Sequence, residues 1–120
     1  MVSITIKRVY EPADQHDGYR ILVDRVWPRG LKKEQVAVEL WLKDAAPSTD
    51  LRKWFGHDRE RWVEFKKRYF AELDQQTDAV SMLMHIAKEK PLILLYSAHD
   101  TECNQAVALK EYLLKKLGVG

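Results

Sequence analysis

The sequence predicts a single α/β domain over residues 1–120, in three layers, with a small, largely parallel sheet and helices on both of its faces. Three observations predict this fold class. The chain has 120 residues, the size of one ordinary domain with its own core. Short apolar segments with strand-like patterns occur at both ends of the chain. Amphipathic segments with helical periodicity lie between them, as expected for parallel strands that are joined by crossover helices.

The predicted strands differ in how their apolar residues are arranged. Residues 3–9 nearly alternate between apolar and polar side chains, which predicts a strand. Residues 19–26 have an apolar centre that is typical of an inner strand covered on both faces. Residues 91–97 form a continuous apolar run, which predicts a buried strand. Residues 36–43 are ambiguous, because alternation favours a short strand whereas the preceding residues fit one helical turn.

Two helices are predicted in the middle of the chain. The first is short, starts at Thr49 or Asp50 after the capping side chain of Ser48, and stops at Gly56. The second starts at an N-cap, Asp58, and runs to about residue 74. Its apolar side chains recur at spacings of three and four residues and should line one buried stripe: Trp62, Phe65, Tyr69 and Leu73.

Two further helices are predicted towards the C-terminus. Thr77 is expected to cap a helix over residues 78–88, with three inward-facing residues: Ala79, Leu83 and Ile86. Asp100 or Thr101 is expected to cap the last helix, which ends at Gly118. Its predicted inner face consists of Ala106, Leu109, Leu113 and Leu117.

Charge and cysteine content exclude several classes of protein. Twenty basic and 18 acidic residues give a formal net charge of +2, too small to indicate a nucleic-acid-binding protein. The longest apolar run, residues 92–96, is far too short to cross a bilayer, so no membrane partner is expected. A single cysteine excludes an intrachain disulfide, and the N-terminus lacks the apolar stretch of a secretory signal. These features predict a cytoplasmic setting.

Sequence motifs for common cofactors and hydrolytic sites are absent from the chain. It contains no phosphate loop, Gly-x-Gly-x-x-Gly or Gly-x-Ser-x-Gly motif, which argues against nucleotide hydrolases, Rossmann dehydrogenases and α/β hydrolases. No cofactor is indicated. A metal site is not predicted either, because the candidate ligands show no ligand spacing such as His-x-x-x-His: His57, His99, Asp24 and Asp100.

The first candidate site follows the second predicted strand, over residues 24–30. In open α/β sheets, ligands bind beyond the carboxyl ends of the strands. The guanidinium groups of Arg25 and Arg29 match a phosphate or a carboxylate in a bidentate way. Arg29 lies in a rigid turn between a proline and a glycine, so we expect it to contact a ligand. Asp24 is either a general base or the structural ion-pair partner of an arginine.

The second candidate site follows the buried strand, over Tyr96–Asp100. This segment is expected to lead into a helix whose free backbone amides attract anions. His99 is the best acid–base candidate in the chain, because imidazole groups titrate near neutral pH. Asp100 is either a ligand contact or simply a helix cap.

A third candidate site surrounds Gly56, where Arg52 and His57 can close the rim of a cleft. Cys103, in the predicted first turn of the last helix, is a possible nucleophile only if its thiol pKa is lowered. The neighbouring Glu102 opposes such a shift, and no partner base is apparent. We therefore expect an unreactive thiol without a catalytic role.

Four motifs together carry a family resemblance: Val23–Leu31, Ala46-Pro47-Ser48, Leu51–His57, and Leu94-Leu95-Tyr96 followed by Asp100 and Asn104. They resemble the bacterial family of unknown function DUF488, in its YeaO-like branch, over about residues 5–114. The resemblance implies a small cytoplasmic α/β protein and no established activity, substrate or cofactor. Relatives in this branch often have histidines where this chain has Cys103 and Gln105. A mechanism that needs an imidazole there would fail unless His99 or His57 replaces it.

The sequence thus predicts a polar, partly basic cleft that binds a small anionic metabolite, with a phosphate-bearing one among the options. The predicted ligand-binding residues are Arg25, Trp27, Arg29, Arg52, Tyr96, Asp100 and Asn104, and the candidate catalytic residues are Asp24, His57 and His99. Whether the protein is an enzyme stays open. The alternative is a non-catalytic module that binds protein or nucleic acid through a basic run: Arg59, Arg61, Lys66, Lys67 and Arg68. The glutamates among them favour a solvated helix face instead.

Overall fold

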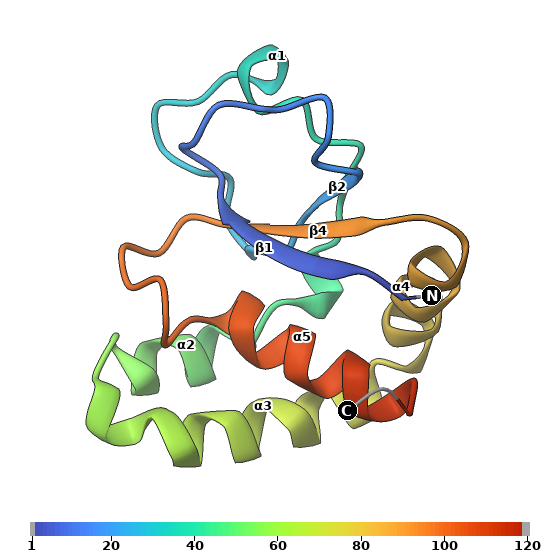
Figure 1. Ribbon diagram of the computed structural model, residues 1–120. Helices are drawn as coiled ribbons and strands as arrows, with labels where there is room; N and C mark the ends of the chain where they lie inside the picture. Colours follow the sequence, from blue (N-terminus) through green and yellow to red (C-terminus); the bar gives the residue numbers. More distant parts are fainter. Residues whose placement is uncertain (1, 119–120) are drawn as a thin grey trace.

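The computed structural model describes residues 2–118, in which the expected strands form one sheet (Figure 1). The sheet has four strands in the order β1-β4-β2-β3, and every neighbouring pair is parallel. Their bounds are Ile4–Arg8 for β1, Tyr19–Leu22 for β2, Leu40–Trp41 for β3 and Leu92–Tyr96 for β4. The predicted α/β class with a parallel sheet is therefore confirmed.

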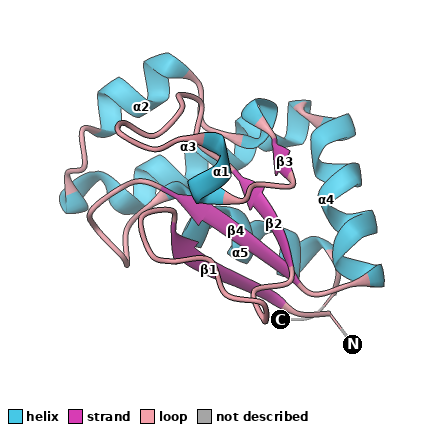
Figure 2. Ribbon diagram, turned by 90° about the horizontal axis from the view of Figure 1, so that it is seen from above, coloured by secondary structure: helices cyan, strands magenta, loops and turns pink. Residues whose placement is uncertain are grey.

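Helices lie on both faces of the sheet, but unequally. One face carries α2 (Thr49–Phe55), α3 (Trp62–Gln75) and α5 (Gln105–Lys116), with α4 (Thr77–Glu89) beside them at one end (Figure 1). The opposite face carries the short α1 (Lys33–Val36) and the loops around it (Figure 2). Two single turns of 3-10 helix, Lys43–Ala45 and Arg59–Arg61, precede α2 and α3 respectively.

The strand β4 supplies side chains to both apolar layers, because successive residues of a strand point to opposite faces. Leu92 and Leu94 join the large cluster on the helical side, whereas Ile93 and Leu95 join the smaller cluster beneath α1. The stripe predicted for α3 packs into the large cluster. Its members Phe65, Tyr69 and Leu73 are buried, and Trp62 is partly buried.

The carboxyl ends of β1, β2 and β4 meet at one edge of the sheet. Arg8 at the end of β1 pairs with Tyr96 at the end of β4. The backbone N–H of Val23 donates to Leu95 O at 3.0 Å, so the chain leaves β2 at the same edge. Residues that follow these strands are thereby brought together, as expected for a parallel sheet.

The second strand is shorter than predicted, ending at Leu22 rather than at residue 26. Only two residues of β2 pair with its outer neighbour β3, and its other neighbour β4 ends at Tyr96. The chain beyond Val23 therefore has no neighbouring strand with which to form further backbone hydrogen bonds. The ambiguous segment 36–43 contains both predicted kinds of structure. Its first residue ends α1, and Leu40 and Trp41 form β3.

Two predicted helix starts are wrong. Thr77 is the first residue of α4 and not its cap, because α3 ends at Gln75 and Gln76 alone joins the two helices. The last helix begins at Gln105, where the side chain of Asn104 caps it by accepting from Val107 N at 3.0 Å. Asp58 caps as predicted, but the turn it caps is 3-10 and leads directly into α3.

Candidate functional site

A cavity of about 680 Å³ opens at the carboxyl edge of the sheet. Its walls come from the end of β1, from the loops that follow β1, β2 and β4, from α2 and the residues that flank it, from Phe65 of α3, and from the start of α5. The loops that follow β2 and β4, separated by about seventy residues in the sequence, thus border one space. Its volume lies in the usual range for sites that bind small organic molecules.

Asp24, the first charged residue after β2, lies in the cavity wall with 7% of its surface exposed. Its Oδ1 accepts a hydrogen bond from Gln105 Nε2, whereas Oδ2 has no hydrogen-bond partner among residues 2–118. Burial raises the pKa of this carboxyl group. The expected ion pair with Arg25 or Arg29 is wrong, because within the described residues no guanidinium lies within 4.0 Å of Asp24.

The two arginines of this loop have different surroundings. Arg25 is half-buried and donates from Nε to Pro47 O at 3.0 Å and from Nη2 to Ala46 O at 3.2 Å. It therefore fastens the loop after β2 to the segment that precedes α2. Arg29 is exposed at the cavity and, within residues 2–118, its side chain makes no hydrogen bond or ion pair.

Trp27 lies between these arginines and serves both the cavity and the fold. Its Nε1 donates to Leu31 O at 2.7 Å, and its ring meets that of Trp41 edge-on at 5.2 Å. The remaining surface of the indole lines the cavity. It contributes an apolar wall rather than a hydrogen-bond donor.

The segment after β4 contributes less to the cavity than predicted. His99 is exposed and lines it, but Tyr96 and Asp100 do not. Tyr96 is the last buried residue of β4. Asp100 points away to Arg59, which donates to its two oxygens at 2.8 and 2.9 Å.

The expected anion site at the amides after Asp100 is absent as well. Its carboxylate already accepts from the N–H groups of Glu102 and Cys103, at 2.9 and 3.0 Å, and α5 starts only at Gln105. These two backbone donors, together with Arg59, lower the pKa of Asp100 to about 2. Asp100 is therefore a structural cap for this loop.

Asn104, which was predicted to bind ligand, lines the cavity but is also engaged by the fold. Its Oδ1 caps α5, and its Nδ2 donates to Asp100 O at 2.8 Å. Its amide therefore has at most one hydrogen left to donate to a ligand.

The rim near α2 contains Arg52 and His57, as predicted. Arg52 is exposed, and its side chain has no hydrogen bond or ion pair within the described part of the chain. His57 follows Gly56, and both residues have left-handed backbones, with φ of 59° and 53°. This conformation is costly for histidine, and residues held in it are concentrated at ligand-binding sites.

Several cavity residues were missed by the sequence analysis, and Arg8 is the most important of them. Its guanidinium donates from Nε to Ala98 O at 2.9 Å and from Nη2 to Ser97 O at 3.2 Å, and it lies 5.0 Å from the ring centre of Tyr10. The position of Arg8 at the end of a predicted parallel strand was a usable signal. Gln105 stood out only as a departure from the family pattern, and its bond to Asp24 had no sequence signal, because it joins residues 81 positions apart.

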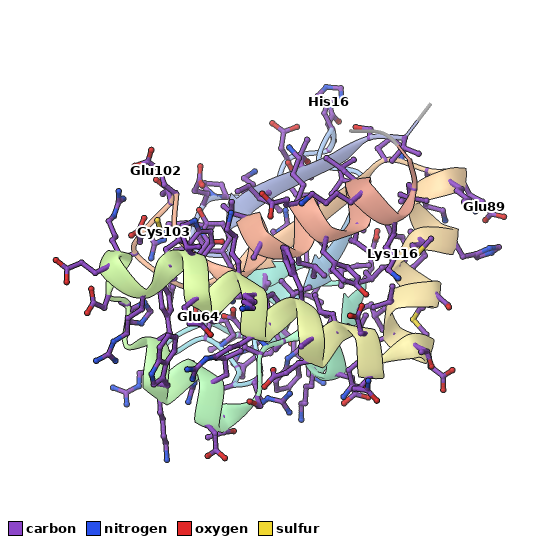
Figure 3. The ribbon with its side chains drawn as sticks, turned by 90° about the horizontal axis from the view of Figure 1, so that it is seen from below. His16, Glu64, Glu89, Glu102, Cys103 and Lys116 are labelled. Carbon is purple, nitrogen blue, oxygen red and sulfur yellow. The ribbon has the colours of Figure 1, made fainter. Side chains whose placement is uncertain are left out.

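Cys103 lies outside the cavity, in the loop before α5 together with Glu102 (Figure 3). Burial and the nearby carboxylate of Asp100 raise the pKa of its thiol. The thiol form therefore dominates at neutral pH, as expected for a residue that is not an activated nucleophile. Within residues 2–118, no three metal-ligating side chains lie close enough together to hold a metal ion.

The chain belongs to the family described as the inactive DUF488-N3 subclade, whose model matches residues 3–119. It is similar to the uncharacterized protein YeaO of Escherichia coli K12, with 49% identity over 93% of this chain and 97% of that protein. It is also similar to the uncharacterized protein Rv3073c of Mycobacterium tuberculosis H37Rv, with 50% identity over 58% of this chain and 59% of that one. No solved structure matches the chain. Among the described residues, no helix is long and apolar enough to span a membrane.

Proposed function

We propose that the protein binds a small anionic metabolite, bearing a phosphate or a carboxylate, in the cavity at the carboxyl edge of the sheet. The charge of the cavity wall carries this proposal. Among the described residues, the wall contains four arginines and two histidines but a single carboxyl group, that of Asp24. Arg29 and Arg52 are exposed with unengaged side chains, so their guanidinium groups can bind an anion without breaking a contact of the fold.

Binding without turnover fits the chain better than catalysis. The family is described as inactive. This chain also has Cys103 and Gln105 at the two positions where relatives of the YeaO-like branch often have histidines. Gln105 also holds Asp24 through Oδ1. We assign Asp24, His57 and His99 to the ligand-contacting wall, and a role for them in proton transfer stays a prediction.

The alternative partner, a protein or a nucleic acid on the basic run that spans the 3-10 turn Arg59–Arg61 and α3, gains no support from the side-chain contacts. Arg68 pairs with Glu64 at 2.9 Å, and Lys66 pairs with Glu111 at 3.4 Å. Arg59 binds Asp100. Because acidic neighbours neutralise much of this run, it resembles a solvated helix face more than a surface for phosphate contacts.

The test of anion binding uses the exposed arginines of the cavity. A panel of phosphate- and carboxylate-bearing metabolites is screened by thermal shift, since a ligand that binds the folded state raises its melting temperature. The dissociation constant of the best anion is then measured by calorimetry for the wild type, R29Q and R52Q. We expect each substitution to weaken binding by about tenfold or more, because it removes a charged hydrogen-bond donor.

Lys53 provides the matched control for Arg52. It is the next residue on α2 and is also exposed, but it does not line the cavity. K53Q therefore changes the net charge as R52Q does and should leave the dissociation constant unchanged. The proposal is overturned if no anion of the panel binds, or if K53Q weakens binding as much as R52Q.

A further inference from the structure

The size of the cavity exceeds what a simple inorganic anion needs. It measures about 680 Å³, whereas a water molecule occupies about 30 Å³ in the liquid. A phosphate or sulfate ion held by Arg29 and Arg52 would leave most of this space to water. A cavity of such size is typical of sites that enclose an organic molecule.

The cavity wall changes in character from its mouth to its inner end. The exposed residues that line it include the basic side chains of Arg29, Arg52, His57 and His99. Its buried wall residues are mostly apolar: Phe55, Phe65, Ala46, Pro47 and Pro28. Phe55 and Phe65 stack on each other with ring centres 4.3 Å apart, so this wall presents aromatic surface. An anion is therefore favoured at the mouth, and an apolar group further in.

Asp24 reinforces this polarity, because it is the acidic group among the buried wall residues. Within the described chain its Oδ2 has no hydrogen-bond partner, and no cation lies within 4.0 Å to neutralise it. When Asp24 is ionised, it repels a second negative charge beside it, because the dielectric constant of this buried region is low. The inner end is therefore less favourable than the mouth for the anionic group of a ligand.

Two exposed apolar side chains extend this surface to the mouth. Large apolar residues with more than 40% exposure are few in the described chain: Tyr10, Val26, Val63 and Met82. Tyr10 and Val26 both line the cavity. The phenol of Tyr10 donates to Arg29 O at 3.1 Å, which holds its ring beside the arginine loop. Apolar and cationic side chains are therefore both present in the exposed part of the wall.

From these observations we infer that the ligand is an amphipathic organic anion, whose ring-sized apolar body enters the cavity while its charged group binds the arginines at the mouth. This inference rests on the proposed function and adds the class of ligand. Either a phosphate or a carboxylate satisfies the arginines, so the apolar body and not the acid is the distinguishing feature.

Paired probes separate the contribution of the apolar body from that of the charge. Calorimetry compares phenyl phosphate with inorganic phosphate, and phenylacetate with acetate, on the wild-type protein. Benzyl alcohol supplies the ring without the charge. We expect the ring-bearing anion of at least one pair to bind about tenfold tighter than its partner, because the ring leaves water. Benzyl alcohol should bind more weakly than that ring-bearing anion.

Val26 and Val63 offer matched variants. Both are exposed valines, at 56% and 77%, but only Val26 of the two lines the cavity. V26S should weaken the binding of the ring-bearing anion by about threefold, because an apolar contact is lost. It should leave the binding of inorganic phosphate or acetate unchanged. V63S should alter neither.

The possible results also distinguish the two proposals. Absence of binding by every anion, charged ring compounds included, overturns the proposed function and this inference with it. If the simple anions bind through Arg29 and Arg52 as tightly as their ring-bearing partners, and V26S changes nothing, the anion site stands and the inference of an amphipathic ligand is wrong.

Discussion

At the scale of single residues, the backbone of His57 links stability to binding. Its φ of 59° lies in the left-handed region, which costs a residue with a side chain about 1–2 kcal/mol and costs glycine almost nothing. We expect H57G to raise the free energy of unfolding by up to about 1 kcal/mol, after allowance for the greater flexibility of unfolded glycine. The same variant should bind the anion more weakly, because its imidazole is lost from the cavity wall.

Ala37 supplies the control for this prediction. It has a similar left-handed φ of 52° at the end of α1 and does not line the cavity. A37G should therefore stabilise the protein in urea denaturation without changing the dissociation constant of the anion. Destabilisation by both glycines would show that the left-handed backbones are not strained, and unchanged binding by H57G would show that the imidazole has no role in the site.

At the scale of secondary structure, the stripe of α3 is the element whose prediction has the clearest energetic consequence. Phe65 is 2% exposed and stacks between Phe55 and Trp62, with ring centres 4.3 and 5.7 Å away. F65A should lower the free energy of unfolding by about 3–5 kcal/mol, since it leaves a cavity in the core. V63A, two residues away but 77% exposed, should change it by less than about 0.5 kcal/mol. A loss below about 1 kcal/mol for F65A would mean that the helix is not held by this stripe.

Elements were predictable where one local pattern dominates. The apolar run of β4 and the three- and four-residue spacing of α3 each have one physical interpretation, and both elements are present, although α3 starts only at Trp62, after a 3-10 turn. The ends of helices and strands were less predictable, because they depend on contacts with residues that are distant in the sequence. The second strand stops where β3 and β4 cease to offer pairing, and Asn104 replaces Asp100 as the helix cap because Arg59 and nearby amides engage Asp100.

At the scale of the whole molecule, the position of the cavity could be predicted but its internal contacts could not. Parallel strands bring their carboxyl ends to one edge, which is why Arg29 and His99 face the same space. The partner of Asp24 is Gln105, from a helix 81 residues later, and no local pattern indicates that contact. Asp100 shows the converse: its local pattern suggested an anion site, and the tertiary structure uses it as a cap.

The response of the molecule to acid combines two carboxyl groups that act in opposite directions. Backbone donors and Arg59 lower the pKa of Asp100 to about 2, so its ionised form stabilises the fold. That stabilisation is complete above the ordinary value of 3.8 and is lost as the pH falls to about 2. Burial raises the pKa of Asp24, so its ionised form destabilises the fold, and this cost is relieved as the pH falls towards 3.8.

Asparagine variants should separate these two contributions, because each removes one titration and leaves a side chain of similar shape. D100N should be less stable than the wild type at neutral pH, and the difference should shrink between about pH 4 and pH 2, where the wild type loses its ionised Asp100. The free energy of unfolding of D24N, relative to that of the wild type, should be highest at neutral pH. This difference should decline as the pH falls towards about 4, because the wild-type carboxyl group then becomes neutral. Free energies of unfolding from urea titrations at several pH values measure both trends. A D24N difference that is constant from neutral pH to about pH 4 would show that the fold does not raise the pKa of Asp24.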